Sequence, residues 1–195
     1  KAVGAQLLDF VDGVKREGSS AVLPVLRAGK EGVEIASTAY FTGYKQAGSL
    51  SLSQTRGYLA AKNLLEKGEA VVQGSFGAAT LSLSQSKGKI DARIDGNGPV
   101  FTISVEAQAD ISAVSGGRSR LGAGEYAQIE KEAAALLEGE VLSALEQSVQ
   151  EDNCDIFGFG NLLYRQYPAY WRTASAGWHE EMAACRYEVR TSVQV

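Results

Sequence analysis

The sequence contains one histidine, His179, and two cysteines, Cys154 and Cys185. A serine triad or a cysteine–histidine pair would have to use His179 as its base. The run from His179 to Ala183 begins like a zinc-protease helix, but Ala183 stands where the second histidine is needed. One histidine and two distant cysteines cannot assemble a zinc site rich in nitrogen and sulfur ligands. We expect His179 to lie on the surface at a helix end and the cysteines to be free thiols, although one disulfide is allowed.

Three local patterns suggest a cofactor, acid/base or anion site, and each has a simpler explanation. Gly158-Phe159-Gly160 begins like a dinucleotide-binding loop, but Leu163 takes the place of the third glycine and the preceding segment is predicted to be helical. Acidic residues gather between positions 124 and 152, where a solvated helix face is the usual explanation. Arg118 and Arg120 lie beside two glycines and could hold an anion, although such arginines more often serve solubility. These patterns give no positive case for an enzyme, a metal or a cofactor.

Composition limits the class of protein. The chain has 195 residues, of which 45% are hydrophobic, enough for one well-buried domain. Its net charge is −4, so it lacks the basic excess typical of nucleic-acid-binding proteins. The longest apolar runs, such as residues 21–26, are far shorter than the roughly 20 residues of a membrane-spanning helix. We expect a soluble domain that does not bind nucleic acid.

Alternating and helical patterns predict the elements that position these residues. The strand over 100–111 is the clearest, because every second residue from Phe101 to Ile111 is apolar and most of the others are polar. Such alternation is typical of a sheet with one wet face, which is usually antiparallel. Helices are predicted over 2–17, over 54–66 with Ser53 as N-cap and Gly68 as stop, and over 125–151. Further strands are predicted at 33–41, 46–52, 69–76, 78–86, 88–95 and 185–195, and an extended connector at 21–32.

This order of elements predicts an α+β fold with a mostly antiparallel β-sheet. The long helix in the C-terminal half should pack across one face of the sheet, and a short aromatic-rich helical segment should precede the last strand. The helix residues expected to contact Phe101, Ile103, Val105 and the final strand are Tyr126, Ile129, Leu136, Leu137 and Leu145. The pentapeptide Leu-Ser-Leu-Ser-Gln occurs at 50–54 and 81–85, and we interpret it as chance because its flanks differ.

The segment 155–182 carries most of the large aromatic residues. Gly158 and Gly160 allow a tight reversal of the chain, and Pro168 suits the first turn of a short helix. Trp171 and Trp178 are seven residues apart, which places both indoles on one helix face. We expect a structural cluster beneath the last strand. The alternative is a secreted small-ligand-binding module, in which Tyr170, Trp171 and Trp178 form a stacking platform and Arg165 contacts an anion.

Two parts of the sequence carry a resemblance to a known family. Residues 155–160 have the form Asp-hydrophobic-Phe-Gly-hydrophobic-Gly, and an Arg-x-x-Pro-x-x-Trp segment and a second Trp follow. Upstream, residues 40–41, 48–50 and 55–58 look like a strand–turn–strand that leads into a helix. Together these matches resemble the spore germination receptor C-subunit family, the Ger(x)C lipoproteins, over about 35–195. The family signature looks structural, and the matching positions are Asp155, Phe157, Gly158, Phe159, Gly160, Arg165, Pro168, Trp171 and Trp178.

The resemblance implies a non-enzymatic C subunit of a spore nutrient-germinant receptor, with a role in receptor assembly or signal relay. Its implied partners are the two membrane-embedded receptor subunits, of the A and B type, and no cofactor is implied. Family members are anchored by lipid to the outer face of the spore inner membrane, and this sequence lacks the lipid-bearing cysteine. Residues 31–195 would then be a soluble C-terminal domain, and residues 1–30 a helix and connector from a preceding domain.

Overall fold

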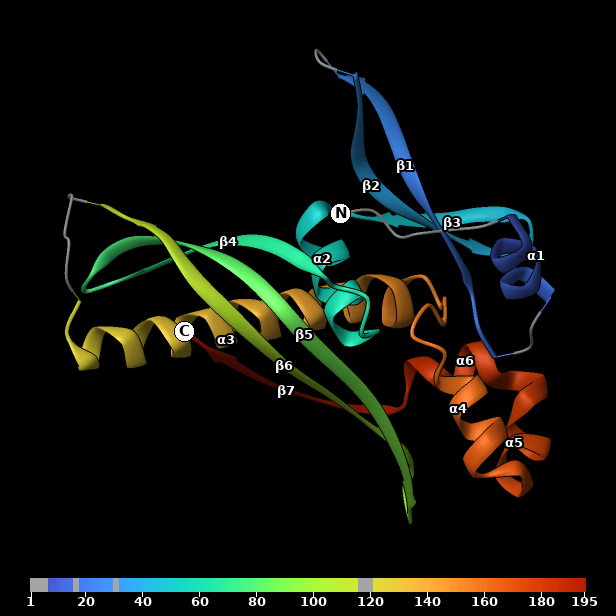
Figure 1. Cartoon of the computed structure of the whole chain (residues 1–195). Helices are drawn as coiled ribbons and strands as arrows, with labels where there is room; N and C mark the ends of the chain where they lie inside the picture. Colours follow the sequence, from blue (N-terminus) through green and yellow to red (C-terminus); the bar gives the residue numbers. More distant parts are fainter. Residues whose placement is uncertain (1–6, 16–17, 30–31, 116–120) are drawn as a thin grey trace.

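The computed structural model describes residues 7–15, 18–29, 32–115 and 121–195, and contains two β-sheets, a long helix and a group of short helices (Figure 1). The predicted α+β fold class is confirmed. The strands are β1 (Ala21–Gly29), β2 (Gly32–Thr42), β3 (Lys45–Leu50), β4 (Lys67–Gly74), β5 (Gly77–Asp95), β6 (Gly98–Val114) and β7 (Arg186–Gln194). The helices are α1 (Leu7–Lys15), α2 (Leu52–Ala61), α3 (Ala123–Leu145) with its π-helical extension η2 (Glu146–Glu151), α4 (Phe159–Gln166), α5 (Pro168–Ala174), η3 (Ser175–Gly177) and α6 (Trp178–Ala183).

The larger sheet has the strand order β4-β5-β6-β7. The β4–β5 and β5–β6 pairs are antiparallel, as predicted, whereas β6 and β7 are parallel. A parallel pair needs a long crossover connection. Here α3 and the short helices α4 to α6 supply it, since they carry the chain from the end of β6 back to the start of β7 (Figure 1).

Two strands predicted separately, at 78–86 and 88–95, are one continuous strand, β5, so that prediction was wrong. The register with β6 shifts between Ser84 and Lys87, and Gln85 between them has a positive φ of 47°. This is a β-bulge, which bends a strand and increases its twist. Gly88 follows this bulge and pairs with Val105, so the strand continues through it.

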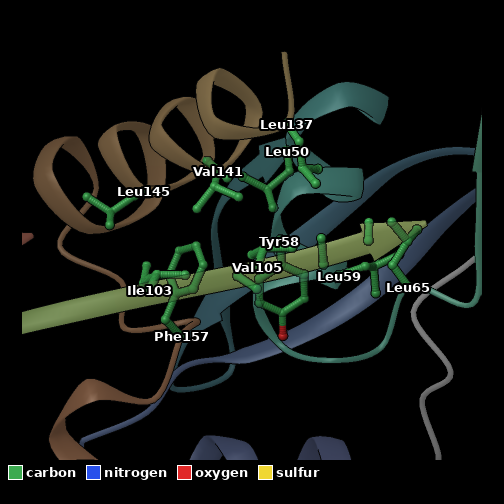
Figure 2. Packing of buried hydrophobic residues seen from close by; sticks show 14 of the residues in the cluster. Leu50, Tyr58, Leu59, Leu65, Ile103, Val105, Leu137, Val141, Leu145 and Phe157 are labelled. Carbon is green, nitrogen blue, oxygen red and sulfur yellow. The ribbon is translucent and has the colours of Figure 1, made fainter. Parts of the chain in front are cut away.

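Helix α3 covers one face of the larger sheet and supplies much of the core. Ile129, Leu137 and Leu145 are buried as predicted, and in Figure 2 side chains of α3 point toward Ile103 and Val105. Tyr126 was predicted to face the sheet, but it is 42% exposed. The prediction was wrong because the buried stripe of the helix begins one turn later, at Ile129.

The same helix lies along the edge strand β7. The Thr191 hydroxyl donates a hydrogen bond to the Ala134 carbonyl at 2.8 Å, and the Val195 backbone N–H donates to the Glu130 carboxylate at 3.1 Å. An edge strand otherwise presents unpaired backbone groups that can pair with another chain. These bonds position the last strand against the helix.

Helix α2 crosses α3 at close range. A Cβ atom on Gly57 would lie 2.5 Å from the backbone carbon of Glu140, so only glycine fits at this crossing. The N-cap of α2 is Ser51 and not Ser53, because Ser51 and Gln54 form a reciprocal capping box. The helix ends at Ala61 and does not reach the predicted end at 66, since Asn63 adopts a φ of 59°.

The smaller sheet has the order β1-β2-β3, with both pairs antiparallel. Residues 21–29 were predicted as an extended connector; they are extended, but they pair with β2 along their whole length. Pro24 is tolerated there because β1 is an edge strand. The predicted boundary between residues 30 and 31 therefore separates β1 from its partner β2, and this pair of strands projects from the body of the molecule (Figure 1).

Two further expectations concern an anion site at Arg118 and Arg120 and the presence of a membrane-spanning helix. Arg118 and Arg120, which were considered as anion ligands, lie outside the described residues, between β6, which ends at Val114, and α3, which begins at Ala123. Among the described helices, none is both long enough and apolar enough to cross a membrane.

Candidate functional site

The signature segment 155–160 folds into a tight reversal around a buried carboxylate. Asp155 is fully buried, and its Oδ1 atom accepts the backbone N–H groups of Gly158 at 2.7 Å and Phe159 at 2.9 Å. Its Oδ2 atom accepts the Gly160 N–H at 2.7 Å and the indole N–H of Trp178 at 3.1 Å. An ionised carboxylate offers about four acceptor sites. All of them are used inside the protein.

The two glycines of this reversal are required by backbone conformation and by space. Gly158 has a φ of 80°, in the left-handed region that favours glycine. A Cβ on Gly160 would lie 2.6 Å from the Gly18 Cα and 2.7 Å from a ring carbon of Trp171. The Asn161 N–H also donates to the Gly18 carbonyl at 3.0 Å. The reversal is therefore in direct contact with the segment that leads into β1.

The two indoles lie inside the group of short helices. Trp171 on α5 is 5% exposed and Trp178 at the start of α6 is 2% exposed, and their rings meet edge to face with centroids 5.4 Å apart. Phe159 contacts Phe101 on β6 and Tyr187 on β7, at centroid distances of 4.4 and 5.1 Å. Such aromatic pairs contribute beyond their buried area. This aromatic cluster seats the short helices on the two parallel strands.

The burial of these indoles decides between the two interpretations of the aromatic segment. A stacking platform needs ring faces that a ligand can reach, and Trp171 and Trp178 have their faces covered by protein. Tyr170 is half-buried. An open platform that uses both indoles was therefore wrong, because the two rings pack against each other and Trp178 also contacts Phe101 of the sheet.

Burial shifts the pKa values of several ionisable groups around the reversal. Burial raises the pKa of Asp155 above the ordinary aspartate value, and the four N–H donors oppose this rise. Burial also raises the pKa of Tyr58, and the charge on Asp155 adds to the effect. The Lys62 Nζ donates to the Phe157 carbonyl at 2.7 Å, and burial lowers the pKa of Lys62. The charge of Asp155 raises this lysine pKa, and that of Arg165 lowers it.

The other signature positions lie at the edge of the cluster. Pro168 is the first residue of α5, as predicted, and is exposed. Arg165 is an exposed residue of α4, and its Nε donates to the Asn161 carbonyl at 3.4 Å. His179 is exposed in the first turn of α6, so its predicted surface position is confirmed, and its Nδ1 lies 3.1 Å from the Asn153 carbonyl oxygen.

Both cysteines are free thiols in this structure. Cys154 is buried with its Sγ 3.0 Å from the Thr42 hydroxyl, and Cys185 is half-buried with its Sγ donating to the Glu181 carbonyl at 3.4 Å. Burial is the main cause of the raised pKa of each thiol. Within the described ranges, no group of three or more His, Cys, Asp and Glu side chains is placed to hold a metal ion.

One buried ion pair was not predicted. Glu140 on α3 is only 6% exposed, although the acidic residues of this helix were predicted to be solvated. Its carboxylate accepts both Nε of Arg56, at 2.8 Å, and Nη2 of the same residue. Arg56 also donates to the Glu69 carbonyl. The segment Thr55-Arg56-Gly57 thus links α2 to α3 and to β4.

Comparisons with known proteins agree with this architecture. Residues 36–195 match the family described as "Spore germination B3/ GerAC like, C-terminal". The crystal structure of the GerBC protein is similar, with a TM-score of 0.79 and 19% sequence identity over 91% of this chain and 56% of that one. The similarity to GerBC concerns the fold, and this chain spans just over half the length of GerBC. No curated protein sequence matches the chain significantly.

Proposed function

Because the chain belongs to the spore germination B3/GerAC-like, C-terminal family, we propose that it is the C-terminal part of the C subunit of a spore nutrient-germinant receptor. The observation that carries this proposal is the family match over residues 36–195, which includes every position of the signature. The similarity in fold to GerBC supports the same assignment. Residues 31–195 are the proposed C-terminal domain, to which β1 adds an edge strand.

The proposed role is non-enzymatic and serves assembly of the receptor or relay of its signal. The geometry of the signature supports this part of the proposal. A catalytic acid or base must reach a substrate atom through a hydrogen bond. The acceptor sites of Asp155 are all engaged by protein N–H groups, and the indoles are covered. The signature therefore supports a scaffold that presents surfaces to other proteins.

The proposed partners are the two membrane-embedded receptor subunits, of the A and B type. The proposed location is the outer face of the spore inner membrane, with attachment through an N-terminal lipid. The family assignment supports both. Crosslinking of the lipoprotein that contains this chain, in spore inner membranes, tests the partners. We expect crosslinks to both subunits, and the absence of any crosslink to either would refute the proposed assembly.

Deletion of the gene in the spore-forming host tests the function. Germination in response to at least one nutrient should be lost or shifted to another nutrient, and a copy of the gene should restore it. Germination by a trigger that bypasses nutrient receptors serves as the control and should be unaffected. Unchanged germination with every nutrient tested would overturn the proposal.

A further inference from the structure

A pocket of about 230 Å³ opens beside the signature reversal. Its walls come from the end of α2, from β5 and from α4, and the residues that matter here are Lys62, Gly158, Asn161 and Arg165. The volume is below the roughly 300 Å³ at which pockets for drug-sized ligands begin. A ligand of a few non-hydrogen atoms fits this space.

Two cationic side chains border this pocket. Lys62 uses one of its three N–H donors on the Phe157 carbonyl, which leaves two. Arg165 uses Nε on the Asn161 carbonyl, at the long distance of 3.4 Å, which leaves the Nη groups. No carboxylate of the described residues forms an ion pair with either side chain.

The carboxylate of Asp155, which lies near Lys62, is not available to these cations. Asp155 is fully buried, and its oxygens already accept four hydrogen bonds. Arg165 lies close enough to Lys62 for the two positive charges to disfavour each other. Two positive charges in one pocket repel each other, and an anion bound between them offsets this repulsion.

The backbone N–H groups of residues 158–161 are not available to an anion, so binding in the pocket depends on side chains. The N–H groups of residues 158–160 are bonded to Asp155, and that of Asn161 is bonded to the Gly18 carbonyl. The start of α4 therefore has no free donor in its first turn to offer an anion. A Cβ on Gly158 would lie 3.6 Å from the Lys62 Nζ, so the glycine keeps this side of the ammonium group open.

We propose that this pocket binds a small oxyanion, a phosphate or carboxylate group, between the Lys62 ammonium and the Arg165 guanidinium. Guanidinium and ammonium groups form short, charge-assisted hydrogen bonds with such oxygens, and the planar fork of arginine matches them in geometry. Anion binding here is independent of whether the chain acts within a receptor.

Titration of the 195-residue chain followed by backbone NMR tests the proposal. Inorganic phosphate and acetate are the two probes, and sodium chloride at the same ionic strength is the reference. We expect one or both probes to cause saturable shifts at the amides of Asn161 and Arg165, with no such shifts in chloride. Saturation by phosphate alone or by acetate alone would assign the oxyanion class.

The variant that tests the site is Arg165→Gln. We do not choose Lys62→Gln, because that variant would also lose the hydrogen bond from Lys62 to the Phe157 carbonyl. Loss of one charge-assisted contact should weaken binding about tenfold or more. The matched control is Arg172→Gln, which removes an exposed arginine of α5 outside the pocket and should leave the affinity unchanged. The absence of saturation with both probes, or equal affinity of the wild type and Arg165→Gln, would overturn the proposal.

Discussion

The indole N–H of Trp178 donates a hydrogen bond of 3.1 Å to the Asp155 carboxylate, across 23 positions of the sequence. The same carboxylate accepts three backbone N–H groups of the reversal that follows it. One side chain thus joins the segment after η2 to the start of α4 and the start of α6. This connection orients the chain shortly before it enters β7.

Replacing this carboxylate by an amide should destabilise the fold. In Asp155→Asn the amide NH2 faces N–H donors, so at least one buried donor loses its acceptor. We expect the free energy of unfolding to fall by about 2–4 kcal/mol, measured by urea denaturation. The control Asp110→Asn, at an exposed position of β6, should change it by less than about 0.5 kcal/mol. Equal stability of the two variants would show that the carboxylate does not hold the reversal together.

Two glycine-to-alanine variants should shift stability in opposite directions. Gly57→Ala places a Cβ 2.5 Å from the Glu140 backbone, so α2 and α3 must separate, at a cost of about 1–3 kcal/mol. Gly139→Ala meets no atom within 4 Å and should stabilise α3 by up to about 1 kcal/mol, because alanine is the better helix former. Thermal unfolding of both proteins checks the signs. A stable Gly57→Ala protein would contradict the close crossing of the helices.

The ion pair between α2 and α3 should contribute measurably to stability. In Glu140→Gln the guanidinium of Arg56 keeps its position but loses a charged acceptor. Since Arg56 is partly exposed, we expect a loss of about 1–3 kcal/mol, below the range for fully buried pairs. The control is Glu146→Gln, at the exposed first residue of η2, which continues α3. The pair would be unimportant if both variants unfolded at the same urea concentration.

Local patterns in the sequence predicted much of this fold, and long-range contacts explain what they missed. The alternation over 100–111 correctly assigned the buried face of β6, and Pro168 correctly marked the start of α5. The prediction of Ser53 as N-cap was wrong, although the Ser51-x-x-Gln54 capping box is a local pattern of the sequence. The burial of Glu140 was not visible, because it depends on α2 crossing α3 at Gly57. The parallel direction of β7 likewise depends on how the short helices return the chain.

The thiol of Cys185 should react slowly at neutral pH. Burial, with a contribution from Glu181, raises the pKa of Cys185 to about 11, against about 8.5 for an ordinary cysteine. A raised thiol pKa lowers the thiolate fraction, so only about one molecule in a thousand is reactive at pH 8. The alkylation rate, followed by mass spectrometry of the Cys185 peptide, should rise about tenfold per pH unit up to about pH 11. A rate that levels off near pH 8.5, as it should in urea, would contradict this environment.

Tryptophan fluorescence tests the central claim, that the signature aromatics are a scaffold and not a binding platform. The chain has two tryptophans, both in the cluster, so the emission reports on this cluster alone. The folded protein should emit at shorter wavelength than the urea-unfolded chain, and neither iodide nor any amino acid or sugar should quench it appreciably. Emission at the wavelength of the unfolded chain, together with saturable quenching by one of these small molecules, would contradict the account.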